Sequence, residues 1–154
     1  MRMFWPEHHD VEEKRIKKVA REFINAFKLL EMYIPMDSLS HSRESLQFYS
    51  SLYKEMGPML TEITCYIICH NGYERRVRIK KTIENAQKVL GYLKILHERY
   101  IISLISNDYL GDERWFSISP LTCEQVVEEI GKCFREMYST RRWRNGGLLI
   151  LFSL

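Results

Sequence analysis

The stretch CYIICHNGYERRVRIKKTI, residues 65–83, decides the fold because it ends one amphipathic helix and begins the next. Asn71 and Gly72 favour the left-handed backbone geometry in which many helices end. The apolar pattern resumes a few residues later, and so short a connection makes the two helices antiparallel neighbours. The same stretch places five cations within the seven residues 75–81, which raises the question of what they contact.

The helix before this turn is predicted to begin after a serine of SLSHSRES (38–45), where Ser40 or Ser42 offers an N-cap oxygen. Gly57 and Pro58 interrupt it midway. Proline removes one backbone hydrogen bond and crowds the preceding turn, so we expect a kink there and not an end. The apolar positions repeat at intervals of three and four residues. They are Leu46, Tyr49, Tyr53, Met56, Leu60, Ile63 and Ile67.

The helix after the turn has an equally regular apolar face, which we predict to continue to Leu104. His97 lies on this face and is interpreted as a hydrogen-bonded core residue, not as a catalyst. The predicted inward positions are Ile79, Ile83, Ala86, Leu90, Leu93, His97, Tyr100 or Ile101, and Leu104.

Two further amphipathic helices flank this hairpin. The first is predicted from about residue 10 to residue 32 and ends at YIP (33–35), because proline disfavours helical geometry in the residue before it. The last follows the break NDYLGDERWFSISP (107–120) and begins at Pro120 or Thr122, and Thr122 with Gln125 matches a capping box. Their apolar faces comprise Ile16, Val19, Ala20, Phe23, Ile24, Phe27 and Leu30, and Val126, Val127, Ile130, Phe134, Met137 and Tyr138.

Four such segments close most simply as an up-down four-helix bundle. We therefore predict an all-α fold with a longer loop between helices three and four. The 154 residues form a single domain, 1–154, whose core spans about 11–144 and which ends in an apolar tail, 145–154.

Composition and end segments indicate the cellular setting. The apolar run LLILFSL (148–154) is far shorter than the ~18 residues that span a membrane. The N-terminal MRMFWPEHHD lacks the apolar region of a signal peptide. We expect a cytoplasmic protein without a membrane partner. The four cysteines, Cys65, Cys69, Cys123 and Cys133, are then free and mostly buried thiols.

No catalytic pattern stands out in the chain. It has neither a GxSxG nucleophile motif nor a glycine-rich loop that cradles phosphate. The groups nearest to a metal site are His8-His9-Asp10 with Glu12 and Glu13, and Cys65 and Cys69 with His70. Neither has the ligand spacing of a structural zinc site. We interpret the first as a polar helix start and the second as core packing, and expect no enzyme activity, no cofactor and no metal.

The cations give the clearest functional pattern. Those of residues 75–81 lie at a helix N-terminus, where the macrodipole disfavours positive charge by ~0.3–1 kcal/mol each. Local stability therefore does not explain them. On the same helix Arg76, Lys80 and Lys88 are predicted to point outward. A second basic group lies along and beyond the last helix and includes Trp143, and arginine beside an aromatic ring suits phosphate contact with base stacking.

A third basic group lies on the first helix, between Lys14 and Arg21. Each group alone is typical of a solvated helix face. Three such groups on one small bundle favour a polyanion, most simply RNA, because clustered lysine and arginine release counterions from phosphate. The predicted nucleic-acid-binding residues are Lys14, Arg15, Lys17, Lys18, Arg21, Arg75, Arg76, Arg78, Lys80, Lys81, Lys132, Arg135, Arg141, Arg142, Trp143 and Arg144.

Two glycines lie inside predicted helices. Glycine in an exposed helix costs ~1 kcal/mol relative to alanine, so Gly91 and Gly131 predict the close approach of another helix, within the bundle or between subunits. The aromatics of the long break, Tyr109, Trp115 and Phe116, and the apolar tail are candidate subunit contacts.

The order of these parts resembles a family of small four-helix bundles. It contains the accessory variability determinants of diversity-generating retroelements and the proteins encoded in ribosomal RNA intervening sequences. The matching parts are a first helix ending in YIP, the start SHSRESL, the long helix RIKKTIENAQKVLGYLKIL, and SISPLTCEQ before EEIGKCF. The sequence departs from the family at Arg135-Glu136-Met137, where a small residue and an aromatic are expected, and its break is longer.

The resemblance implies a protein without catalytic activity that forms a barrel-like homo-oligomer, a pentamer in this family. It also implies binding to RNA, or to the cDNA copied from it, and to a reverse transcriptase that carries out mutagenic copying. The basic residues above are the ones it would assign to these contacts. The alternative is a structural or protein-interaction bundle that binds no nucleic acid and uses apolar patches.

Overall fold

The computed structural model describes residues 5–37, 42–105 and 119–139, and these residues fold as an all-α four-helix bundle. The helices are α1 (Trp5–Tyr33), α2 (Arg43–His70), α3 (Tyr73–Ile105) and α5 (Cys123–Ser139), with a short 3-10 helix η1 (Ile34–Met36) after α1. No strand occurs in these three ranges. The predicted fold class is confirmed, and no helix in the described part of the chain is long and apolar enough to cross a membrane.

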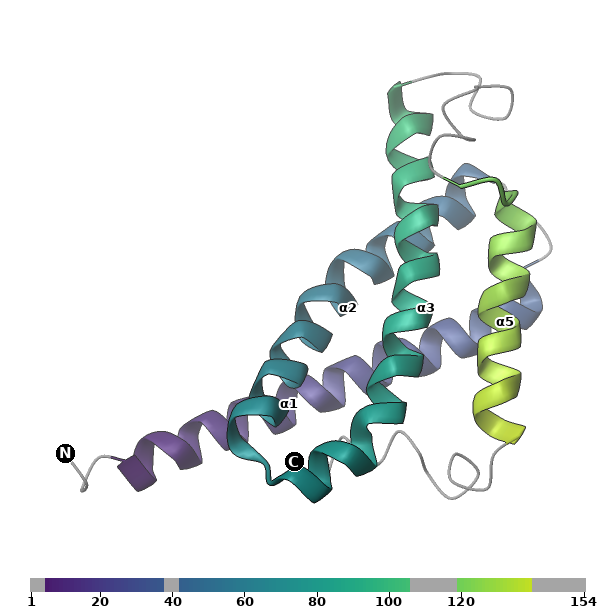
Figure 1. The fold of residues 1–154 in the computed structure, drawn as a ribbon. Coiled ribbons are helices and arrows are strands. Elements are labelled where there is room, and N and C mark those ends of the chain that lie inside the picture. The colour runs from purple at the N-terminus through teal and green to yellow at the C-terminus, as the bar shows by residue number, and fades with distance from the viewer. Residues whose placement is uncertain (1–4, 38–41, 106–118, 140–154) are drawn as a thin grey trace.

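The α2–α3 hairpin is the centre of the bundle. The two helices run in opposite directions and make the most extensive helix contact, while α1 packs on α2 and α5 packs on α3 (Figure 1). The predicted faces meet in one core, and the aromatic rings of Phe27 on α1 and Phe134 on α5 join edge to face at 5.0 Å. The exceptions among the predicted positions of α1, α2 and α5 are Val19, Tyr53 and Tyr138, which are half-buried.

The turn between α2 and α3 is as short as predicted, but its backbone differs. Asn71 is extended, with φ −112° and ψ 147°, and Gly72 also lies outside the left-handed range. The Asn71 N–H donates to the Ile67 carbonyl at 3.2 Å, and the Gly72 carbonyl accepts from the Arg76 N–H at 3.1 Å. The prediction of left-handed geometry is therefore wrong, because an extended residue reverses the chain while the Asn71 N–H and the Gly72 carbonyl each keep a hydrogen bond to the adjoining helix.

Two predicted helix starts and the continuation of α2 past Pro58 are confirmed, whereas the kink at Gly57-Pro58 stays a prediction. The Ser42 hydroxyl caps α2 by accepting from the Ser45 N–H at 3.1 Å. Thr122 and Gln125 form the capping box, with reciprocal hydrogen bonds of 2.8 and 3.1 Å from the backbone N–H of each to the side chain of the other. The helix α2 continues through Pro58 without ending there.

Helix α1 begins at Trp5, earlier than the predicted start near residue 10, and ends at Tyr33. The pattern missed its first turns because they carry no apolar stripe.

The end of α3 departs from the predicted face. Arg99 is 1% exposed, whereas Ile101 and Leu104 are 38% and 57% exposed and His97 is half-buried. A helix of 3.6 residues per turn drifts relative to an apolar repeat of three and four residues. In α3, the buried positions after Leu96 are therefore Arg99 and Ser103.

The cysteine prediction is half right. Cys123 and Cys133 are buried free thiols whose pKa is raised by burial, which keeps them protonated and unreactive. Cys65 and Cys69 are exposed, so the interpretation of these two as core residues is wrong. The inward positions of this part of α2 are Ile63, Tyr66 and Ile67, which turns the two thiols outward.

Candidate nucleic-acid interface

The predicted cations of α3 lie on its surface, next to the α2–α3 turn. Arg76, Arg78, Lys80 and Lys81 are exposed, and Arg75 is half-buried. The inward positions of this part of the helix are Ile79, Thr82 and Ile83, which direct the basic residues outward. The structure therefore places these five predicted residues at one end of the bundle, which we call the hairpin end.

A shallow groove of about 480 Å³ opens at the hairpin end, between α2 and α3. Arg76 and Lys80 lie one turn apart along it and are accompanied by exposed Ile68, Tyr73 and Val77. Tyr73 is 74% exposed, which leaves its ring accessible for stacking. A surface of this kind combines positive charge with an aromatic platform, as single-stranded nucleic acid requires.

Most of these cations are not neutralised locally. Lys80 Nζ lies 3.9 Å from Glu84 Oε1, at the outer limit of an ion pair. For Arg76, Arg78 and Lys81, the described part of the chain offers no carboxylate within ion-pair distance. Arg78 and Lys81, three residues apart, share a helix face with exposed Lys88. The positive charge of the hairpin end therefore faces solvent.

Two cations of the α1 basic group form ion pairs within the protein. Arg15 donates to Glu62 of α2, and Lys17 Nζ lies 3.3 Å from Glu13 Oε1. The remaining predicted residues are exposed and form no ion pair with another described residue; these are Lys14, Lys18 and Arg21.

The α1 group and the hairpin end are near each other. Glu12 of α1 lies 3.3 Å from the His70 ring at the end of α2, and the rings of Tyr66 and His70 stack at 4.4 Å. The pKa of Tyr66 is raised mainly by burial, and it also responds to Glu12 and Glu13 from α1 and to Arg75 from α3. The N-terminal half of α1 thus belongs to the same end of the bundle as the cations of α3.

The described residues do not connect the basic group of α5 to the hairpin end. Lys132 Nζ pairs with Glu129 Oε1 at 3.1 Å. Arg135 lies instead along a second groove, where the other charged residues are acidic. The predicted contacts Arg141, Arg142, Trp143 and Arg144 lie outside the described residues.

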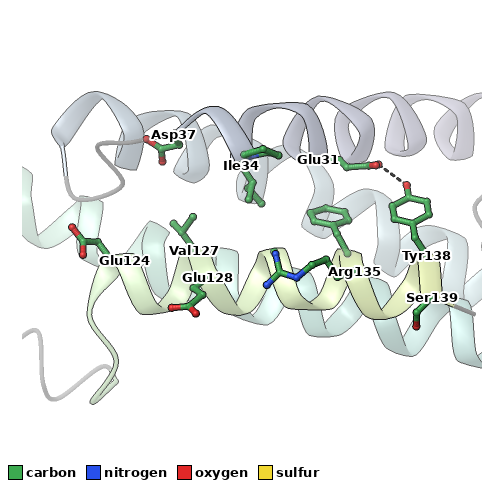
Figure 2. Close-up of a pocket in the computed structure, with 12 residues that line it drawn as sticks. Glu31, Ile34, Asp37, Glu124, Val127, Glu128, Arg135, Tyr138 and Ser139 are labelled. Carbon is green, nitrogen blue, oxygen red and sulfur yellow. Dashed lines mark hydrogen bonds between the residues drawn. The ribbon is translucent and has the colours of Figure 1, made fainter.

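The second groove, which sequence reasoning missed, lies between the end of α1 with η1 and one face of α5 (Figure 2). Its volume is about 910 Å³. Glu31 and Asp37 come from the α1 side and Glu124 and Glu128 from α5, as Figure 2 shows. These carboxylates are far apart in the sequence, so no local pattern could have indicated them. We call this region the acidic groove.

The two glycines inside predicted helices, Gly91 and Gly131, have different surroundings. Gly131 is buried, and a Cβ atom there would lie 3.4 Å from Arg135 Nη1 and 3.7 Å from Ile34 Cγ2, so η1 is in ordinary contact with this position and not so close that only glycine fits. Gly91 is exposed, and a Cβ atom there would have no described neighbour within 4 Å. The prediction of a close helix within the bundle is wrong for Gly91, and a contact between subunits stays a prediction.

His97 is hydrogen-bonded, as the sequence predicted, but it is half-buried and not a core residue. Its Nδ1 lies 2.6 Å from the Ser50 hydroxyl, and its ring lies 5.1 Å from that of Tyr53. Burial first and the charge of Lys54 second lower the pKa of His97, while Glu98 opposes them. The folded protein therefore favours the neutral imidazole.

This depressed pKa predicts a pH effect on stability. The unfolded chain protonates His97 near pH 6.5 and the folded chain at lower pH, so the free energy of unfolding falls as pH drops below about 6.5. We expect that fall to be smaller in His97→Gln, measured by urea unfolding between pH 7.5 and 5.0. Equal falls in both proteins would contradict the assignment, and Lys54→Gln, which removes the second cause, should show an intermediate fall.

The described residues contain no cluster of three or more histidine, cysteine, aspartate or glutamate side chains that could hold a metal ion. His70 contacts Tyr66 and Glu12, and the side chains of His8, His9 and Asp10 lie outside the described residues.

Comparison with known proteins finds no match for this chain. No protein-family model matches the chain, and neither a curated protein nor a solved structure shows significant similarity to it.

Proposed function

We propose that this chain is a non-catalytic nucleic-acid-binding protein that contacts RNA through the hairpin end. The observation that carries the proposal is the set of exposed cations Arg76, Arg78 and Lys81, which no described carboxylate neutralises. Phosphate would supply the missing negative charge, and exposed Tyr73 would supply a surface on which a base stacks.

The position of these cations strengthens the argument. They lie in the first three turns of α3, and the helix dipole makes positive charge unfavourable in the first of these turns, where Arg76 lies. Exposed cations of α1, including Lys14 and Lys18, lie in the half of that helix that belongs to the same end of the bundle. An anionic ligand would relieve the mutual repulsion of these groups, and an extended phosphate backbone is long enough to contact both helices.

The resemblance to accessory variability determinants makes the proposal more specific. On that reading the protein acts in the cytoplasm as a homo-oligomer, a pentamer in the family. It binds template RNA or its cDNA, associates with a reverse transcriptase, and supports mutagenic cDNA synthesis without catalysing it. These partners rest on the order of the sequence parts, including YIP at the end of α1 and EEIGKCF in α5.

The test is size-exclusion chromatography with light scattering on the purified protein, with and without a structured RNA, at low and moderate salt. We expect a discrete homo-oligomer whose mass increases with RNA and which releases the RNA as salt rises. A monomer that is indifferent to RNA would overturn the proposal.

A protein-interaction bundle is the second candidate function. It is favoured by the apolar residues of the same groove, Ile68, Tyr73 and Val77, which are 58%, 74% and 51% exposed. This candidate predicts partner binding that is insensitive to salt and is lost in Val77→Asp. RNA binding that survives Val77→Asp and weakens with salt would exclude it as the function of this groove.

A further inference from the structure

Two thiols lie on the outer surface of α2, close to its C-terminal end. Cys65 and Cys69 are free and exposed, whereas the other two cysteines of the chain, Cys123 and Cys133, are buried. A free cysteine in a protein without disulfides most often packs in the interior as a small apolar residue, and neither exposed thiol has that role. What the fold leaves available at these two positions is the chemistry of sulfur.

The two exposed thiols share one face of the helix. They are four residues apart, and the buried residues of this part of α2, Ile63, Tyr66 and Ile67, face the core. Residues four apart on an α-helix lie one above the other, with their Cβ atoms about 5–6 Å from each other. Both sulfur atoms therefore belong to one small patch of surface and can reach the same ligand.

The spacing does not suit a disulfide bond between Cys65 and Cys69. A disulfide requires Cβ atoms about 3.5–4.5 Å apart, and α2 continues as a regular helix through both residues, which holds these atoms further from each other. An atom placed between the two sulfurs fits better. Two metal–sulfur bonds of about 2.3 Å span up to about 4.6 Å, which rotation of the two side chains brings within reach.

The surroundings of the pair limit the kind of ion. In the described part of the chain, no third cysteine, histidine or carboxylate joins the two thiols in a cluster. The histidine next in sequence, His70, stacks on Tyr66 at 4.4 Å and lies 3.3 Å from Glu12. A structural zinc ion requires four ligands, so it does not fit here. Thiolates also prefer soft ions such as Cu(I), which accepts two of them in a linear arrangement.

We propose that Cys65 and Cys69 together bind one soft metal ion of the Cu(I) class, with one thiolate ligand from each residue. Each thiol loses its proton as its sulfur binds the ion, so one Cu(I) displaces two protons and no electron is transferred. The site lies within one chain and does not depend on the binding of RNA at the hairpin end.

The test is an anaerobic titration of the reduced, intact protein with Cu(I) in the presence of a chromogenic Cu(I) chelator, whose colour reports how much ion the protein removes. We expect one Cu(I) per chain. Cys65→Ser and Cys69→Ser should each weaken binding about 100-fold, because a single thiolate loses the advantage of holding the ion at two points. Unchanged affinity in either variant would overturn the proposal.

A positional control keeps the number of thiols and separates them. Cys65→Ser combined with Thr61→Cys leaves thiols at the exposed positions 61 and 69, which are about 12 Å apart along the helix at 1.5 Å per residue. This variant should bind Cu(I) as weakly as Cys65→Ser alone, and circular dichroism should show that it is folded. If it binds like the unaltered protein, the spacing of Cys65 and Cys69 does not make the site.

Two further measurements locate the ion. Cys133→Ala removes a buried thiol and should leave Cu(I) binding unchanged, whereas a loss of binding would place the ion in the interior and contradict the proposal. Light scattering should give the same protein mass with and without Cu(I). A mass that increases with Cu(I), and only when Cys65 and Cys69 are both present, would show that two chains share the ion and would also contradict it.

Discussion

The triple variant Arg76→Glu, Arg78→Glu and Lys81→Glu is expected to bind RNA about 100-fold more weakly than the unaltered chain. Each substitution removes one exposed cation and places an anion near phosphate, at a cost of roughly 1 kcal/mol per position in water. The affinity of a fluorescein-labelled RNA, followed by anisotropy at low salt, measures the effect. The three residues are exposed and their side chains form no ion pair with another described residue, so the fold should be unaffected.

A matched control separates a local surface from overall charge. Lys28→Glu, Lys54→Glu and Lys94→Glu make the same change in net charge at exposed positions of α1, α2 and α3, and none of the three lines the hairpin-end groove. The control should lose less than tenfold in affinity. If both triple variants weaken RNA binding equally, the interaction is a diffuse effect of net charge, and the hairpin end is not the binding surface.

The variant Arg99→Met is expected to lower the free energy of unfolding by about 3 kcal/mol, although it removes a buried charge. Arg99 is 1% exposed and ties the start of α5 to α3. Its Nη2 donates to the carbonyls of Ser119, at 3.1 Å, and Leu121, and its Nη1 lies 3.6 Å from Cys123 Sγ. Methionine keeps much of the volume but donates nothing, so the buried Ser119 carbonyl and the part-buried Leu121 carbonyl lose a donor.

Thermal unfolding measures this prediction, and the midpoint should fall by roughly 10 °C. The control Lys94→Met removes an exposed cation from the same helix and should change stability by less than about 0.5 kcal/mol. Equal midpoints for Arg99→Met and the unaltered protein would show that the guanidinium does not hold the α3–α5 connection.

The helical architecture could be predicted because its determinants are local. Spacing of three and four residues identified the buried faces of α1, α2 and α5, and that of α3 as far as Leu96, and single side chains marked several helix boundaries. Ser42 and Thr122 cap the predicted helices, and Pro58 interrupts the pattern without ending the helix. Such signals involve residues within one or two turns of each other, and a sequence displays them directly.

The wrong predictions concern residues whose contact partners are distant in the sequence. Arg99 is buried because backbone carbonyls of residues 119 and 121 accept from it, and no rule of composition places those acceptors there. Arg15 was predicted to contact nucleic acid, yet it pairs with Glu62, 47 residues away. That pair weakens the case for Arg15, while the exposed Lys14 and Lys18 remain available.

The acidic groove could not be predicted from the sequence for the same reason. Its carboxylates come from α1, the residue that follows η1, and α5, and in the sequence each of them is simply one acid among many charges. The hairpin end was recognisable because its five cations are consecutive or nearly so. A site assembled from one segment can be predicted from the sequence, whereas one assembled from three requires the fold.

The most direct test of the central claim is the salt dependence of RNA binding by the unaltered protein. The dissociation constant is measured by anisotropy between about 50 and 300 mM salt. If Arg76, Arg78 and Lys81 each contact a phosphate, the logarithm of the dissociation constant should rise with the logarithm of the salt concentration with a slope of about 2 or more. No binding at the lowest salt, or an affinity that does not change with salt, would contradict the claim that the hairpin end is a nucleic-acid interface.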